Sequence, residues 1–118
     1  MAKILIVDDA EFLRVRLTKM LNTDGHEVFQ AENGAKAVTT YKEIHPDVVL
    51  MDVTMPEMDG LTALREIVSL DAKARIIMLT ALGQESVVLE AVKSGARDFI
   101  VKPFEHERVM KAIAKLLA

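Results

Sequence analysis

The chain has 118 residues, of which 51% are apolar and 28% charged, a length that suits one domain with a buried core. The net charge is −3 with acids and bases interspersed, which excludes the basic surface of a nucleic-acid binder and a polybasic membrane patch. There is no cysteine, so disulfides and thiolate sites are excluded, and no apolar stretch is long enough to insert into a membrane. We therefore expect a cytoplasmic monomer without a signal sequence.

Five apolar runs alternate with five segments of helical periodicity. The expected strands are 3–7, 27–30, 47–51, 75–79 and 98–101, and each is followed by an expected helix. In chain order, the apolar faces of these five helices consist of Leu13, Leu17, Met20 and Leu21; of Ala37, Tyr41 and Ile44; of Leu61, Leu64 and Val68; of Val88, Ala91 and Val92; and of Val109, Ile113, Leu116 and Leu117.

Three of these runs are apolar at every position over residues 4–7, 48–51 and 76–79, as expected where helices cover both faces of a parallel sheet. Residues 27–30 are more polar, which suits an edge strand. Right-handed crossovers between successive parallel strands allow few topologies, and the common short one has strand order 2-1-3-4-5. The expected fold class is therefore α/β, a flavodoxin-like, doubly wound, five-stranded parallel sheet with five helices on two faces.

Four of the apolar runs end in reactive polar residues. Asp8 and Asp9 follow the first run, Asp52 the third, Thr80 the fourth and Lys102 the fifth. A single Asp after a strand is usually a helix cap or a turn former. In the expected topology, however, all four ends meet at one edge of the sheet, and the switch point between the first and third strands places the three carboxylates together.

Carboxylates gathered at one point need a cation. Mg²⁺ prefers hard oxygen ligands and is commonly held by one or two carboxylates plus phosphate oxygens, so it fits this set better than zinc does. His26, His45 and His106 have no metal-ligand spacing. Three carboxylates, a hydroxyl and a lysine together indicate magnesium-dependent phosphoryl chemistry.

Four short motifs carry a resemblance to a known family. They are IVDD at 6–9, VLMDVTMPEMDG at 49–60, LTA at 79–81 and FIVKPF at 99–104. Together they resemble the receiver domain of two-component response regulators, and the resemblance covers the whole chain. Because the chain stops after the fifth helix, we expect a single receiver domain over 1–118 with no output domain, similar to the single-domain chemotaxis regulators.

The resemblance implies a role for each residue of the acidic cluster. Asp52 would accept a phosphoryl group from a histidine of a sensor kinase or phosphotransfer protein. Asp9, Asp52 and the backbone carbonyl of Thr54 would bind Mg²⁺, and Asp8 would support the metal through water. Lys102 would pair with the phosphoryl oxygens. The protein would catalyse only its own phosphoryl transfer and autodephosphorylation, so we do not expect an enzyme.

The resemblance also implies a conformational switch. Thr80 is similar to the family's switch hydroxyl, and Phe99 would turn inward when the fourth helix, the fifth strand and the fifth helix form the surface for a downstream protein target. Phe99 stands where many chemotaxis members carry Tyr, so a chemotaxis role and another phosphorelay role both stay open. The Lys102–Pro103 peptide bond is expected to be cis, as in the family.

Two further features follow from the same resemblance. Thr54 and Leu82, two residues beyond Asp52 and Thr80, are where the family tunes the lifetime of the phosphorylated state. Kinase and phosphotransfer partners would dock on the first helix and on the loop after the fifth strand. Residues expected at that docking surface are Phe12, Val15, Pro103 and Phe104.

Two other protein classes remain as alternatives. A haloacid-dehalogenase-like phosphatase also uses Asp, Thr, Lys and Mg²⁺, but it normally has an acid two residues beyond the nucleophile on the first strand, where Asp8 is followed by Asp9 and Ala10. The chain is also short for a substrate cap. A flavodoxin-like carrier of flavin mononucleotide shares the expected topology, but its Ser/Thr-rich phosphate loop and ring-stacking aromatics are missing.

Overall fold

The structure is a computed structural model that describes residues 2–55 and 58–118. All ten expected elements are present in the expected order. They are β1 (Lys3–Val7), α1 (Glu11–Thr23), β2 (Glu27–Ala31), α2 (Gly34–Ile44), β3 (Val48–Asp52), α3 (Gly60–Leu70), β4 (Ile76–Thr80), α4 (Glu85–Lys93), β5 (Asp98–Val101) and α5 (His106–Leu117).

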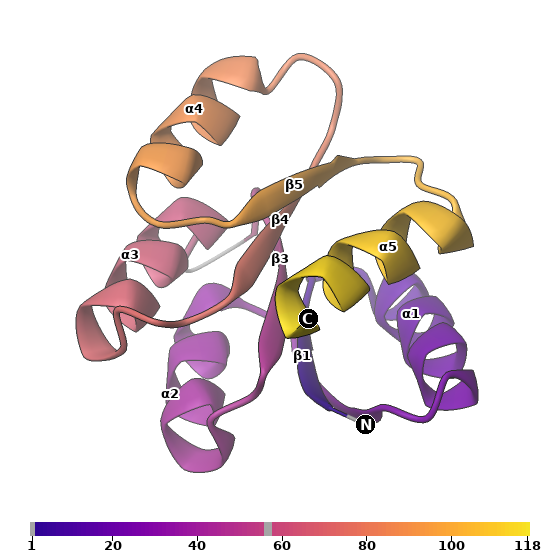
Figure 1. The fold of residues 1–118 in the computed structure, drawn as a ribbon. Helices are drawn as coiled ribbons and strands as arrows, with labels where there is room; N and C mark the ends of the chain where they lie inside the picture. Colours follow the sequence, from indigo (N-terminus) through magenta and orange to yellow (C-terminus); the bar gives the residue numbers. More distant parts are fainter. Residues whose placement is uncertain (1, 56–57) are drawn as a thin grey trace.

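The five strands form one parallel sheet in the order β2-β1-β3-β4-β5, so the predicted topology is confirmed (Figure 1). The more polar β2 lies at one edge, as predicted. Three strands differ from the sequence prediction by one residue: β2 extends to Ala31, and both β3 and β4 begin and end one residue later, so that they include Asp52 and Thr80. Both side chains are therefore held by the sheet itself, which fixes their backbone more firmly than a loop would.

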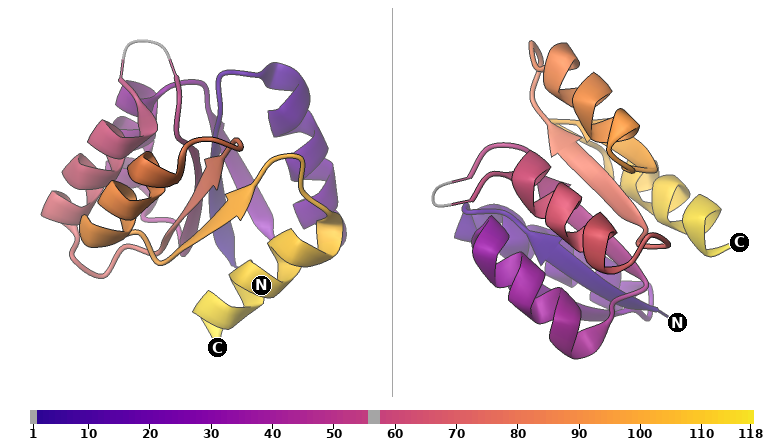
Figure 2. Two further views of the ribbon diagram at one scale, coloured as in Figure 1. Left: turned by 90° about the horizontal axis from the view of Figure 1, so that it is seen from above. Right: turned by 90° about the vertical axis from the view of Figure 1, so that its left-hand side faces the viewer.

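Alternating side chains of the central strands build two separate cores. On one face, Leu5 and Met51 belong to a cluster that packs against α2, α3 and α4, and on the other face Ile6 and Leu50 belong to a cluster that packs against α1 and α5. The two helical layers are visible on opposite sides of the sheet in Figures 1 and 2. Both faces of the sheet are thus covered, which explains why the central strands are apolar at every position.

One predicted core residue is not in the core. Val92 belongs to the expected apolar face of the fourth helix, but its side chain is 49% exposed, whereas Val88 and Ala91 are buried. The reason is geometric, since α4 packs beside β4 near the edge of the sheet and only one narrow side of the helix reaches it. Val92 instead adds to an apolar surface together with Leu89.

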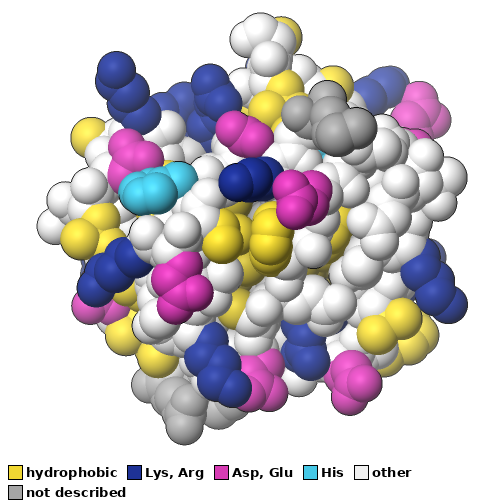
Figure 3. All heavy atoms as spheres, turned by 90° about the horizontal axis from the view of Figure 1, so that it is seen from below, with side chains coloured by type: hydrophobic (Ala, Val, Ile, Leu, Met, Phe, Trp, Pro, Cys, Tyr) yellow, Lys and Arg dark blue, Asp and Glu magenta, His cyan; other side chains and the backbone are white. Residues whose placement is uncertain are grey.

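The charged side chains lie on the surface with both signs interspersed. Figure 3 shows this for one face, where Lys and Arg alternate with Asp and Glu around a small apolar area. On this face neither sign of charge forms a continuous patch. Among the residues that the structure describes, no helix has the length and apolar character needed to cross a membrane.

Candidate functional site

The acidic cluster expected from the sequence is present at the carboxyl ends of β1 and β3. Asp8 and Asp9 follow β1, and Asp52 is the last residue of β3. The parallel register pairs Val7 with Met51, so the residues that follow them lie side by side. Each of the three carboxylates offers an oxygen, and these oxygens lie within 4.8 Å of one another. Residues separated by more than forty positions in sequence therefore form one acidic site.

Lys102, the residue after β5, joins this cluster. Its Nζ atom lies 3.0 Å from Asp8 Oδ2 and 3.0 Å from Asp52 Oδ1. Its backbone N–H donates to the carbonyl of Thr80 at 2.7 Å, which fixes the start of the β5–α5 connection against the end of β4. The Lys102–Pro103 peptide bond is cis. One ammonium group is thus shared between two carboxylates in a mostly buried position.

The three carboxylates have different surroundings. Asp8 is buried, and both its oxygens already accept hydrogen bonds, Oδ1 from the Ala10 N–H at 2.9 Å and Oδ2 from Lys102. Asp52 is also buried, whereas Asp9 is exposed to solvent. This arrangement leaves Asp9 and Asp52 better placed than Asp8 to contact an ion directly.

Burial and crowding raise the pKa of Asp52. Loss of solvent is the largest cause, and the charges of Asp8 and Asp9 add to it, while the hydrogen bond and the charge of Lys102 oppose it. Burial lowers the pKa of Lys102, but its hydrogen bonds and ion pairs with Asp52 and Asp8 outweigh burial and raise it overall. Lys102 therefore stays charged, and three carboxylates facing one ammonium leave negative charge that a divalent cation would neutralise.

The donor set fits magnesium. It consists of hard carboxylate oxygens, one of them on a solvent-exposed residue where metal-bound waters find room. The carbonyl of Thr54, two residues beyond Asp52, is the remaining ligand expected from the sequence. Residues 56–57 of the motif at 49–60 lie outside the described residues.

Gly60 allows α3 to begin directly beside this site. A Cβ atom at this position would collide with the carbonyl oxygen of Asp52, so only glycine permits the approach. The Gly60 N–H donates to the Val53 carbonyl at 2.8 Å, and the Asp59 side chain caps the helix by accepting from the Thr62 N–H at 2.8 Å. These contacts close the β3–α3 connection around the end of β3 and hold the Asp52 backbone in place.

Thr80 and Lys102 lie on neighbouring strand ends, as expected, but the sequence did not indicate the partner of Thr80. The Thr80 hydroxyl is buried and lies 3.0 Å from Oε1 of Gln84, the residue before α4. Gln84 also contacts Thr54, with its Nε2 atom 3.0 Å from the Thr54 hydroxyl. The one sequence signal for this contact is spacing, since Gln84 stands four residues after Thr80, directly before α4.

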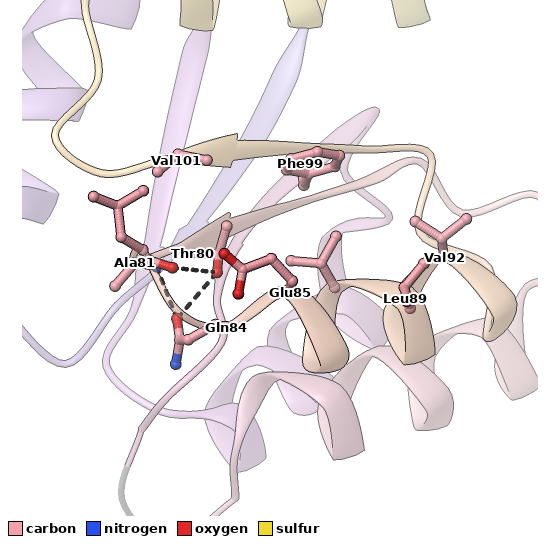
Figure 4. Close-up of a pocket in the computed structure, with 10 residues that line it drawn as sticks. Thr80, Ala81, Gln84, Glu85, Leu89, Val92, Phe99 and Val101 are labelled. Atoms are coloured by element: carbon pink, nitrogen blue, oxygen red, sulfur yellow. Dashed lines mark hydrogen bonds between the residues drawn. The ribbon is translucent and has the colours of Figure 1, made fainter.

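Unlike the buried Thr80, the switch residue Phe99 and the lifetime residue Leu82 lie at the surface. Phe99 is 40% exposed on β5 and, with Thr80, lines a hollow between β5 and α4 (Figure 4). Leu82 is 81% exposed in the β4–α4 connection. Neither side chain contacts the carboxylates of the acidic site in this structure. The switch role of Phe99 and the lifetime role of Leu82 stay predictions.

The expected docking residues divide into two groups. Phe12 and Val15 are 74% and 40% exposed on α1, and Pro103 is exposed after β5. Phe104 differs from the expectation, because its side chain is buried in the cluster beneath α5 and at most forms the floor of a surface hollow. The docking role of all four residues stays a prediction.

Comparison with known proteins agrees with this geometry. Residues 4–114 match the family model described as "Response regulator receiver domain". The chain is 59% identical over 116 residues to "Chemotaxis protein CheY" of Bacillus subtilis, covering 98% of this chain and 97% of that one, and 50% identical over 115 residues to "Chemotaxis protein CheY" of Thermotoga maritima, covering 97% and 96%.

A solved structure of a CheX-CheY-BeF3-Mg complex from Borrelia burgdorferi superposes with a TM-score of 0.93. Its sequence identity is 38%, and the match covers 98% of this chain and 89% of that one. The family model spans nearly the whole chain, and the motifs lie at the strand ends where the acidic site is built. The chain therefore belongs to the response regulator receiver family.

Proposed function

We propose that Asp52 is the phosphoacceptor of this chain and that Mg²⁺ is its cofactor. The chain is a phosphorylation-switched signalling protein of the chemotaxis-regulator type and not a classical enzyme. The observation that supports Asp52 most directly is the shared ammonium of Lys102, which lies 3.0 Å from an oxygen of Asp52 at the centre of the acidic cluster. A buried nucleophile beside a fixed cation is the arrangement that phosphoryl transfer requires.

In the transfer step, a carboxylate oxygen of Asp52 attacks the phosphorus of a phosphohistidine on a sensor kinase or phosphotransfer protein. A phosphorus–oxygen bond forms, the phosphorus–nitrogen bond breaks, and its electron pair stays on the imidazole, which takes up a proton. Lys102 is already within hydrogen-bond distance of Asp52, so its ammonium can follow the incoming phosphoryl oxygens. Mg²⁺ held by Asp9, Asp52 and the Thr54 carbonyl would neutralise phosphoryl charge, and Asp8 would orient Lys102 and a metal-bound water.

The phosphoryl group is later lost by hydrolysis, in which water attacks phosphorus and the bond between phosphorus and the Asp52 oxygen breaks. Thr54 and Leu82 flank the expected path of that water. The Leu82 side chain carries no group that could orient water, and it extends into solvent. We infer that these two residues set the lifetime of the phosphorylated state.

We infer that the chain acts as a free-standing receiver. This inference is supported by the Bacillus subtilis and Thermotoga maritima relatives, whose lengths the match covers almost completely. The names of these relatives support a role in chemotaxis. We propose a sensor histidine kinase upstream and a protein target downstream. The monomeric state and the cytoplasmic location stay predictions.

The output surface is proposed on α4, β5 and α5. Exposed apolar side chains surround a hollow of about 350 Å³ between α4 and β5, where Thr80 forms part of the wall (Figure 4). Leu89 and Val92 of α4 face this hollow together with Phe99 and Val101 of β5. A protein target that buries these side chains would bind a surface directly connected to the phosphorylation site.

One experiment separates this function from the two alternatives. The purified protein is incubated with acetyl phosphate and Mg²⁺, and separately with a phosphomonoester. We expect a colourless protein that gains one labile phosphoryl group and shows no multiple turnover of the phosphomonoester. Sustained turnover would instead support a phosphatase, and a bound yellow flavin would support an electron carrier.

Thr80→Val should uncouple phosphorylation from the output surface. The substitution keeps the shape of the side chain but removes the hydroxyl that can donate to a phosphoryl oxygen. We expect beryllofluoride with Mg²⁺ to bind, while the NMR shifts of Phe99 and the rest of residues 84–110 become much smaller than in the wild type. A full response of these resonances in the variant would show that Thr80 is not the coupling residue.

Phe12→Asp should slow transfer from a phosphohistidine protein by about tenfold, because it places a charge in the centre of the expected helix-docking surface. Phosphorylation by acetyl phosphate should be unchanged, since this small donor needs no docking. Leu70→Asp is the matched control, as Leu70 is an exposed leucine at the end of α3 on the other side of the sheet. Equal slowing with both donors would mean that the variant damages the site itself.

A further inference from the structure

The carboxamide of Gln84 connects three groups on two loops, and we name this set of contacts the Gln84 bridge. Its Oε1 atom lies 2.7 Å from the Ala81 N–H nitrogen and 3.0 Å from the Thr80 hydroxyl, and its Nε2 atom lies 3.0 Å from the Thr54 hydroxyl. Figure 4 shows the oxygen directed at Thr80 and Ala81 and the nitrogen directed away from them. The bridge therefore joins Thr54, which follows β3, to the end of β4 and the residue after it.

The direction of each hydrogen bond is fixed by chemistry. A backbone N–H can only donate, so the atom 2.7 Å from Ala81 N must be the amide oxygen. The same oxygen can only accept, so the Thr80 hydroxyl donates to it at 3.0 Å, and the Ala81 carbonyl, 3.2 Å away, is a second and longer acceptor for the same proton. The amide nitrogen then donates to Thr54, whose hydroxyl accepts. In this structure the Thr80 proton is thus used within the β4–α4 connection.

This use of the proton conflicts with the switch. A hydroxyl has one proton, so Thr80 can donate to a phosphoryl oxygen on Asp52 only after it leaves Gln84. Thr80 is 2% exposed, which means that water does not readily replace Gln84 as its partner in the resting state. When Thr80 leaves, Gln84 Oε1 keeps its hydrogen bond from Ala81, so no buried polar atom is left unpaired.

The bridge also lies between the site and the output surface. Gln84 lines the apolar hollow with Phe99 and Leu89, and it also lines a second hollow that includes Val53, Thr54 and Val87. Space on both sides gives the carboxamide room to move. Gln84 is the residue before α4, so its side chain stands next to the first turn of that helix.

We propose that Gln84 is a positioning residue that holds the Thr80 hydroxyl in the resting state and must release it when Asp52 is phosphorylated. The proposal rests on the proposed function of Asp52 and Thr80 and adds a residue that opposes activation. A contact present only in the resting state lowers the apparent affinity for any ligand that selects the active state. Removing the bridge should therefore make activation easier.

The test uses beryllofluoride with saturating Mg²⁺ as the probe, and the fluorine NMR signal of the bound species reports the concentration at half-saturation. Gln84→Met keeps the length of the side chain but removes both polar atoms. We expect the beryllofluoride concentration at half-saturation to be about fivefold lower than in the wild type. A change of this size corresponds to the loss of one neutral hydrogen bond from the resting state. Thr54→Val removes only the acceptor of the amide nitrogen, and we expect a smaller decrease in the same direction.

Two further variants make the result specific. Ser86→Met introduces the same residue at an exposed position in the first turn of α4 and should leave half-saturation unchanged. In a Thr80→Val background, Gln84→Met should have no effect, because the hydroxyl that it holds is absent. A decrease that persists in this background, or an unchanged or higher half-saturation concentration in Gln84→Met alone, would overturn the proposal. A wild-type protein that binds no beryllofluoride would overturn the proposed function itself.

Discussion

Asp52→Asn will abolish phosphorylation by acetyl phosphate while the fold stays intact. The amide has nearly the shape of the carboxylate and its oxygen can still accept from Lys102, but it lacks the charge and nucleophilicity that attack on phosphorus requires. Removing one buried carboxylate also relieves repulsion with Asp8 and Asp9, which together with burial raise the pKa of Asp52. We therefore expect no phosphoryl adduct by intact-protein mass spectrometry and no loss of thermal stability.

Asp47→Asn is a matched control for this experiment. Asp47 precedes β3 and Asp52 ends it, so the same substitution is made at the two ends of one strand. The Asp47 carboxylate accepts from the Lys3 N–H, far from the acidic cluster. Its variant should be phosphorylated at the wild-type yield. An adduct at undiminished yield in Asp52→Asn would move the acceptor to another residue.

Asp9→Asn will have opposite effects on metal binding and on stability. The variant removes the most exposed carboxylate of the cluster, so we expect magnesium affinity to fall by about tenfold or more and phosphorylation to fall with it. Without Mg²⁺ the same change removes repulsion among three carboxylates that lie within 4.8 Å of one another. The melting temperature of the magnesium-free protein should therefore rise by a few degrees.

The magnesium effect of Asp9→Asn is separated from a general charge effect by Glu11→Gln. Glu11 is an exposed acid two residues away at the start of α1. Its variant should bind Mg²⁺ with wild-type affinity when binding is measured by calorimetry. Unchanged magnesium affinity in Asp9→Asn would remove Asp9 from the metal site, and equal losses in both variants would reduce its role to long-range attraction.

The strand order and the acidic cluster could be predicted because both depend on simple periodic features. Runs such as 48–51 are apolar throughout only when helices cover both faces of the sheet. Once the strands are parallel, the residues at their carboxyl ends must share one edge, which places Asp8 beside Asp52 without any knowledge of side-chain contacts. The prediction of the site thus needed only the topology.

The features that escaped prediction depend on local packing. Val92 fits the apolar pattern of α4, but the position of that helix near the sheet edge leaves it exposed. Phe104 was expected on the docking surface from the family resemblance, yet its ring is buried in the cluster beneath α5. Gln84 was missed because a polar residue before a helix is common, and only coordinates reveal that its amide bridges Thr54 and Thr80.

The most direct test of the account is to locate the phosphoryl group in the wild-type chain. The protein is phosphorylated with acetyl phosphate, with and without Mg²⁺, and then reduced with borohydride, which converts an aspartyl phosphate to homoserine. Peptide mapping by tandem mass spectrometry identifies the converted position. We expect homoserine at position 52 alone and only in the presence of Mg²⁺. Homoserine at position 8, 9 or 59, or equal conversion without Mg²⁺, would contradict magnesium-assisted transfer to Asp52.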